Sequence, residues 1–252
     1  MQKKIGIITL GCKVNQYESE AFAEELRKRG YLTADGVEDC DGYIINTCTV
    51  TAEADRKSRQ MIRRAARAKE GVPVVVTGCT AEYSAKELSE IDGVIAVCGN
   101  AKKLECIDIL DNYFKGTNNE YPILNVPPIE EAQFERMSLN AFPRTRVYIK
   151  IEDGCENKCA YCAIPKARGN VRSKAPEDIL REVKGFIDAG CREIVLTGIE
   201  TASWGKDLKQ GETLIDAMEA IAASKKMMRG HRLQLLKLDA SLWWYYLASV
   251  AA

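Results

Sequence analysis

The chain has 252 residues, with 36 basic and 36 acidic side chains and therefore no net formal charge when its single histidine is neutral. Hydrophobic residues make up 46% and charged residues 29%, as in ordinary soluble globular proteins. This balance excludes a broadly polyanion-binding chain, so any contact with nucleic acid needs a local basic patch. No run of about 18 apolar residues occurs, so we expect no contact with a membrane. In the expected cytoplasmic location, the ten cysteines would be thiols or metal ligands rather than disulfides.

Residues 1–115 alternate apolar runs with helical patterns, and we take them as one domain. Strands are expected at "KIGIITL", "DGYIIN", "VPVVVT" and "GVIAVC". Helices are expected near Glu18–Arg29, Ala52–Lys69, Ala81–Glu90 and Lys103–Phe114. Continuous Ile and Val runs separated by helices predict an α/β fold with a doubly wound parallel sheet.

Residues 116–145 break this alternation and contain four of the seven prolines: Pro122, Pro127, Pro128 and Pro143. Such a composition predicts an extended linker between two domains.

A second β/α series occupies residues 146–224. Strands are expected at "RVYIKI" and "REIVLTG", and helices near Pro176–Ala189 and Glu212–Ala223. This spacing predicts an incomplete β/α barrel. Residues 225–252 do not resemble further barrel strands, and we expect an aberrant tail of the kind that truncation or a frame shift produces. For such a chain, weak activity or none is expected.

Three cysteines in "DGCENKCAYC" follow the pattern C-x3-C-x2-C: Cys155, Cys159 and Cys162. A [4Fe–4S] cluster is normally held by four thiolates, so three would leave one iron open to a small molecule. An open position distinguishes catalytic metal centres from closed structural ones. A zinc ribbon and a four-cysteine electron carrier are the alternatives, and both need a fourth ligand that the loop does not supply.

A second set of three cysteines follows three expected strands of the N-terminal domain, where "IITLGC", "YIINTC" and "VVVTGC" end at Cys12, Cys48 and Cys79. Ligands gather beyond the carboxyl ends of the strands in doubly wound sheets, so these cysteines can converge. The pattern predicts a second cluster with an open iron, against the alternative of three chance core cysteines. We interpret Cys40, Cys98, Cys106 and Cys191 as small core residues.

The cysteine loop, with an aromatic residue before its last cysteine, resembles the radical S-adenosylmethionine (SAM) superfamily. The resemblance implies that SAM binds the open iron of the cluster on Cys155, Cys159 and Cys162, the catalytic centre. It also implies that Tyr161 lies near the adenine, and that Gly198 and Glu200 in "LTGIE" face the SAM amino group. Arg168 is a candidate for the SAM carboxylate.

Over residues 3 to 215 the chain resembles the methylthiotransferase family, through "LGCKVNQYESE", "NTCTVT", "VVTGC", "DGCENKCAYCAIPKARGNVRS" and "EIVLTGIETASWGKDL". "GCKVNQYES" is most similar to the tRNA branch acting on N6-threonylcarbamoyladenosine. The resemblance implies two [4Fe–4S] clusters, SAM, and addition of a methylthio group to C2 of that adenosine. The implied partners are a tRNA anticodon loop and a reducing electron donor such as flavodoxin or ferredoxin.

Two stretches of cations are candidates for contact with RNA. The expected helix Ala52–Lys69 carries Arg56, Arg59, Arg63 and Arg67 along one face, with Lys57 and Arg64 beside it. A solvated helix face is an equal alternative. "KARGNVRSK" adds Lys166, Arg168, Arg172 and Lys174, which could hold either the SAM carboxylate or RNA phosphates. Three functions compete with the leading hypothesis: methylthiolation of another tRNA adenosine or a ribosomal protein, electron transfer by a non-catalytic two-cluster protein, and partner binding by a regulatory remnant.

Overall fold

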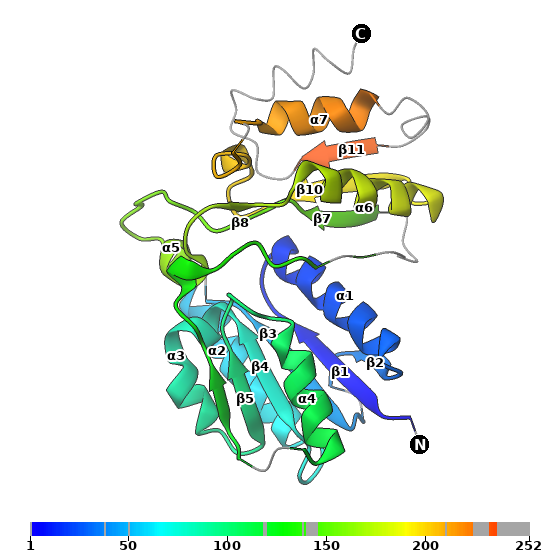
Figure 1. The fold of residues 1–252 in the computed structure, drawn as a ribbon. Coiled ribbons are helices and arrows are strands. Elements are labelled where there is room, and N and C mark those ends of the chain that lie inside the picture. The colour runs from blue at the N-terminus through cyan, green and yellow to red at the C-terminus, as the bar shows by residue number, and fades with distance from the viewer. Residues whose placement is uncertain are drawn as a thin grey trace. The chain divides into compact units, whose positions relative to one another are not determined.

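The computed structural model describes residues 2–37, 39–49, 51–117, 120–137, 139, 146–209, 211–223 and 232–235. The chain divides into two compact units (Figure 1). The first comprises Met1–Met137 and Glu156–Asn170, and the second comprises Ser138–Cys155 and Val171–Ala252. The predicted domain boundaries did not anticipate that most of the cysteine loop would pack with the N-terminal unit.

The first unit is built on a six-stranded sheet in the order β2-β1-β3-β4-β5-β6, in which every neighbouring pair is parallel. The strands are β1 (Lys4–Thr9), β2 (Leu32–Asp35), β3 (Gly42–Thr47), β4 (Val74–Gly78), β5 (Val94–Cys98) and β6 (Ile123–Asn125). The strand order reverses at β1, which makes the gap between β1 and β3 a topological switch point. The predicted α/β fold with a doubly wound parallel sheet is confirmed.

Four helices cover this sheet: α1 (Lys13–Lys28), α2 (Ala52–Ala66), α3 (Cys79–Ser89) and α4 (Glu105–Lys115). Helix α1 contacts α4 and α2 contacts α3, and Figure 1 shows the two pairs on opposite faces. Alternate strand residues such as Tyr43, Ile45 and Val76 pack with Ile62 and Leu88 in a buried cluster. No helix of the described residues is long and apolar enough to cross a bilayer.

Part of the predicted linker belongs to the first unit. Residues Ile123–Asn125 pair with β5 as an edge strand, and prolines are tolerated beside an edge strand because only one side of it has to pair. Further along, the Glu135 carboxylate accepts the Lys103 and Leu104 N–H groups at 3.0 and 2.8 Å. Tyr17 Oη donates to the Met137 carbonyl at 2.7 Å. The linker prediction is therefore wrong for these described residues.

The second unit contains three parallel strands in the order β11-β10-β7, namely β7 (Arg146–Lys150), β10 (Glu193–Thr197) and β11 (Arg232–Leu235). An antiparallel pair flanks the cysteine loop: β8 (Glu152–Asp153) and β9 (Arg172–Ser173). The helical segments are α6 (Pro176–Asp188), η2 (Thr201–Ser203) and α7 (Leu214–Ala223). Because β11 continues the parallel sheet, the expectation that residues 225–252 contain no further barrel strand is wrong for Arg232–Leu235. The aberrant tail itself stays a prediction, and the rest of residues 225–252 lies outside the described residues.

Candidate cysteine and cofactor sites

The structure brings the three N-terminal cysteines to one edge of the first sheet. Cys12 follows β1 and is the N-cap residue of α1, Cys48 follows β3, and Cys79 is the first residue of α3 after β4. Strands β1, β3 and β4 are consecutive neighbours in the sheet. The three thiols therefore lie beyond the carboxyl ends of adjacent strands, beside the switch point where doubly wound sheets bind ligands.

A glycine before two of these cysteines allows the strand ends to approach closely. A Cβ atom on Gly11 would lie 2.8 Å from Cys48 Cβ and 2.9 Å from Cys48 Sγ. Gly78 has φ 96° and ψ −167°, a conformation almost restricted to glycine, and a Cβ there would lie 2.4 Å from the Thr47 carbonyl oxygen. Glycine therefore precedes Cys12 and Cys79 because the loops at this edge pack too closely to admit a side chain.

The Cys48 backbone is held by side chains from two helices. Its N–H donates to Ser58 Oγ of α2 at 3.3 Å, and its carbonyl accepts from Thr80 Oγ1 of α3 at 3.1 Å. Both Ser58 and Thr80 are fully buried. These bonds fix the Cys48 loop between the middle of α2 and the N-terminal end of α3.

Two of the three cysteines lie at helix N-termini. Cys12 is the N-cap residue of α1 and Cys79 is the first residue of α3, where unpaired N–H groups and the helix dipole favour the binding of an anionic group. All ten cysteines are free. Within the described ranges, no group of three or more Cys, His, Asp or Glu residues is arranged to hold a metal ion. The donor types thus suit an iron–sulfur cluster, whereas the described side chains do not form a closed ligand set.

A buried polar network lies beside Cys12. The Glu18 carboxylate contacts Arg168 Nη1 at 3.1 Å and also Lys103 Nζ, and all three side chains are at most 1% exposed. Arg168 Nη2 donates to Asn15 Oδ1 at 2.7 Å, and Cys12 Sγ lies 3.6 Å from the same oxygen. The sequence prediction missed Asn15, Glu18 and Lys103, although Asn15 and Glu18 share the buried face of α1 with Val14 and Tyr17.

The second half of the cysteine loop is docked on the first unit through the short helix α5 (Ile164–Arg168). Tyr83 Oη donates to the Ala163 carbonyl, and Asn100 Nδ2 donates to the Ala167 carbonyl at 2.6 Å. Burial raises the pKa of Tyr83, and the sulfurs of Cys79 and Cys162 raise it further. One cysteine of each predicted set therefore lies within electrostatic reach of the same phenol.

The loop cysteines have different accessibilities. Cys159 is exposed, whereas Cys155 and Cys162 are half-buried. Tyr161 is 93% exposed, which leaves its ring available to a planar ligand. The roles of these four residues in binding a cluster and SAM stay predictions.

Three of the four cations after the loop are buried. Arg168 contacts Glu18, Arg172 lies 3.5 Å from Asp153, and Lys174 contacts Glu182, with each cation's side chain at most 7% exposed. Lys166 is exposed. The suggestion that Arg168, Arg172 and Lys174 contact RNA phosphates is wrong in this structure because their charges are enclosed. The prediction that Arg168 binds the SAM carboxylate stays a prediction, and it competes with the contacts to Glu18 and Asn15.

In the second unit, Gly198 and Glu200 are organised by a carboxyl group that the sequence prediction missed. Glu152 Oε2 accepts the Glu200 N–H at 2.8 Å, and a Cβ on Gly198 would lie 2.6 Å from the same oxygen. Glu152 is fully buried, and burial raises its pKa to about 8 despite backbone hydrogen bonds from Glu200 and Ile199. Asp153 adds to the rise and Lys150 opposes it. Glu152 thus shapes the backbone that we expect to face SAM.

A Glu152→Gln variant is expected to change how stability depends on pH. The folded pKa of about 8 lies above the ordinary 4.5, so the stability that the protonated carboxyl contributes is complete below pH 4.5 and is lost as pH rises toward 8. Glutamine cannot ionise, so the free energy of unfolding of the variant relative to wild type should rise by about 4 kcal/mol between pH 5 and 8. Urea unfolding followed by Trp204 fluorescence measures this, with Trp243 and Trp244 replaced by phenylalanine. Parallel pH profiles of the two proteins would contradict the role given to Glu152.

Two family models match separate parts of the chain. Residues 4–99, which include Cys12, Cys48 and Cys79, match the uncharacterized protein family UPF0004. Residues 149–233, which include the cysteine loop, Gly198 and Glu200, match the radical SAM superfamily. The sheet topologies and the two cysteine sets therefore define a radical SAM protein with an additional cysteine-bearing α/β unit.

Similarity to individual proteins identifies the family within the radical SAM superfamily. The chain is 43% identical over 203 residues to the threonylcarbamoyladenosine tRNA methylthiotransferase MtaB of Bacillus subtilis (strain 168), covering 80% of this chain and 44% of that protein. It is 34% identical over 248 residues to MtaB of Aquifex aeolicus (strain VF5), covering 94% and 60%. The ribosomal protein uS12 methylthiotransferase RimO of Desulforamulus reducens is 33% identical over 218 residues, covering 85% and 48%. The chain belongs to the radical SAM methylthiotransferase family, and it spans about half the length of these curated relatives.

A solved structure supports the fold. The radical SAM methyltransferase TsrM from Kitasatospora setae, with cobalamin and a [4Fe–4S] cluster bound, aligns with a TM-score of 0.58 and 17% identity. The alignment covers 92% of this chain and 56% of TsrM. At this identity the likeness concerns the fold alone.

Proposed function

We propose that the chain adds a methylthio group to C2 of N6-threonylcarbamoyladenosine next to the anticodon of tRNA. The observation that carries the proposal is the pairing of a C-x3-C-x2-C loop with three cysteines at neighbouring strand ends, in a chain similar to the MtaB proteins. A single cysteine set would support a radical SAM enzyme of any kind. The second set supports an enzyme that also handles sulfur.

Each cysteine set would hold one [4Fe–4S] cluster, one on Cys12, Cys48 and Cys79 and the other on Cys155, Cys159 and Cys162. When bound, the clusters and SAM would supply the radical and sulfur chemistry that an aromatic C–H group demands and that side-chain acids and bases cannot provide. Helix α1 is capped by Cys12 and helix α3 begins at Cys79, so the positive N-terminal ends of both helices would lie beside an anionic cluster bound there. Tyr161, Gly198 and Glu200 would bind SAM, with Glu152 holding the Glu200 backbone.

The partners follow from the same chemistry. A base in an anticodon loop is reached at a lower unstacking cost than a base inside a duplex. One-electron cleavage of SAM needs an external reductant, for which we propose a flavodoxin or a ferredoxin. These partners are consistent with a cytoplasmic location.

The experiment is an activity assay of the full chain after anaerobic reconstitution, with SAM and a chemical reductant. We expect 5′-deoxyadenosine and 2-methylthio-N6-threonylcarbamoyladenosine when the tRNA carries N6-threonylcarbamoyladenosine. Measurable amounts of these products would overturn the sequence-based expectation of weak or no activity. Substrates for comparison are tRNA carrying N6-isopentenyladenosine and ribosomal protein uS12, since the similarity to RimO makes the ribosomal protein the second candidate. A Cys155→Ala variant is the negative control. Methylthiolation of uS12 but not of tRNA would overturn the tRNA assignment.

A further inference from the structure

The arginines of α2 fall into two groups. Arg56 Nη2 lies 2.7 Å from Glu53, and Arg59 lies 3.0 Å from both Asp55 and Glu87. By contrast, Arg63, Arg64 and Arg67 make no side-chain hydrogen bond or ion pair within the described part of the chain. All three are exposed. Helix α2 and its C-cap therefore present, at one end, three guanidinium groups without an ion pair to any described residue. Arg63 and Arg67 also line a second pocket whose carboxylates come from Glu70, Glu87, Glu90 and Asp92, so Arg64 is the arginine farthest from acidic neighbours.

The sequence of α2 explains why these groups lack partners. Glu53 and Asp55 occupy the first turn, and no acid occurs from Arg56 to Lys69. Arg59, Arg63 and Arg67 are spaced i, i+4, and like charges at this spacing destabilise a helix by about 0.2–0.5 kcal/mol per pair. The favourable effect of a cation near a helix C-terminus accounts for one or two basic residues in the last turn. A longer run of arginines is destabilised by repulsion between their charges, and a bound anion would offset that repulsion.

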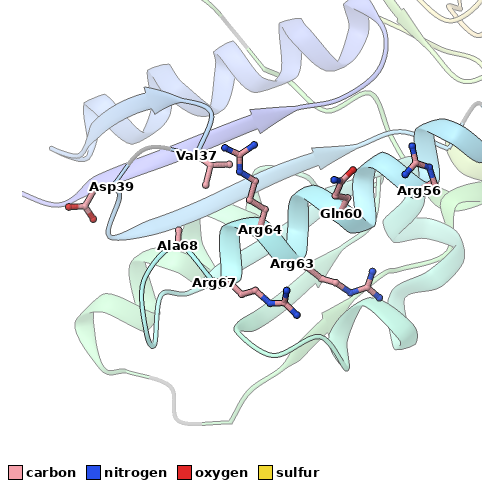
Figure 2. A pocket seen from close by; sticks show the side chains of 8 residues that line it. All are labelled: Val37, Asp39, Arg56, Gln60, Arg63, Arg64, Arg67 and Ala68. Atoms are coloured by element: carbon pink, nitrogen blue, oxygen red, sulfur yellow. The ribbon is translucent and has the colours of Figure 1, made fainter.

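The three arginines line a groove of about 850 Å³ (Figure 2). Arg64 extends along one side of the helix toward Val37, and Arg63 and Arg67 extend along the other. Arg56, Gln60 and Ala68 complete the helical wall, and Asp39 is the one carboxylate in the lining. The groove is larger than a single phosphate needs, and it presents donors on both sides of α2.

We propose that this groove binds sugar-phosphate backbone of the tRNA substrate. Guanidinium groups pair with phosphates through two parallel hydrogen bonds, and Gln60 adds an uncharged donor. Helix α2 begins directly after the Cys48 loop, and Arg64 lies 13 residues beyond the Thr51 N-cap, or roughly 20 Å along the helix axis. Phosphates bound there would belong to nucleotides some distance from the reacting base. The identity of the RNA rests on the proposed function, whereas the groove itself does not.

The test is tRNA binding by the reconstituted full chain without SAM, using an unmodified tRNA transcript and fluorescence anisotropy at several salt concentrations. The variant is Arg63→Ala, Arg64→Ala and Arg67→Ala together. The matched control is Arg27→Ala, Lys28→Ala and Arg29→Ala, which removes the same charge from the C-terminal end of α1. We expect the groove variant to bind at least tenfold more weakly, with a salt slope smaller by about 2–3. The control should stay within threefold of wild type.

A third variant, with Arg63, Arg64 and Arg67 replaced by lysine, should keep most of the salt slope but lose affinity, because lysine cannot form the paired bonds. Equal losses in the groove variant and the α1 control would overturn the inference. The inference would also be overturned if the groove variant bound tRNA normally but could no longer be reduced by flavodoxin. That result would indicate that the groove binds an acidic protein. Because binding is measured without SAM, tRNA binding without methylthio transfer contradicts the proposed function alone. If the groove variant binds tRNA like wild type and still transfers the methylthio group, only the inference about the groove is contradicted.

Discussion

Replacing Glu18 by alanine is expected to destabilise the first unit by about 3–5 kcal/mol. The carboxylate is fully buried and contacts Arg168 and Lys103, so its loss removes the acid that faces two buried cations. The same change frees Arg168 from one of its partners and should loosen α5, the helix that follows the cysteine loop. Hydrogen exchange measured by mass spectrometry reports the opening free energies of α1 and α5 separately.

The control lies on the same helix. Glu25 pairs with Arg29 at 3.0 Å, and the two side chains are 33% and 30% exposed, so Glu25→Ala should destabilise the protein by less than about 1 kcal/mol. A triple variant with methionine at Glu18, Lys103 and Arg168 tests the interaction itself. The triple variant should lose less folding stability than the sum of the losses in the three single methionine variants, because no buried charge is left without a partner. An additive triple, or a Glu18→Ala variant within 1 kcal/mol of wild type, would contradict the electrostatic interpretation.

The fold could be predicted where burial dictates the sequence pattern. β3, β4 and β5 are buried along their whole lengths, so their Ile and Val runs predicted them. β2 is partly exposed and β6 has only three residues, so neither has such a run. β11 was missed for the same reason, since four residues give too little pattern. Short edge strands depend on the neighbour that they pair with, and a local pattern does not contain that neighbour.

The candidate site shows a similar division. The six cysteines stood out because three of them form a compact C-x3-C-x2-C motif and the other three each follow an apolar run. The glycines before Cys12 and Cys79 reinforced the second pattern. The buried charges did not stand out, because Glu18, Lys103 and Arg168 are far apart in sequence and each is an ordinary surface residue type. Glu152 was also missed, because a glutamate next to an aspartate is an ordinary surface pattern in a sequence. Only the fold shows that Arg168 is enclosed while Arg64 is open to solvent.

Converting Cys12, Cys48 and Cys79 to alanine together is expected to halve the iron content after anaerobic reconstitution, from about eight to about four irons per chain. The remaining iron would be held by the cysteine loop, so SAM cleavage to 5′-deoxyadenosine should continue while methylthio transfer is lost. Iron analysis and Mössbauer spectroscopy measure the first effect, and product analysis measures the second.

The matched control replaces three other cysteines of the first unit, Cys40, Cys98 and Cys106, by alanine. All three are buried, and burial raises the pKa of Cys106, which disfavours the thiolate that a cluster needs. This variant should keep about eight irons. If instead both triple variants lose the same amount of iron, the loss reflects packing rather than ligation. If neither loses any, the thiols at the ends of β1, β3 and β4 hold no cluster.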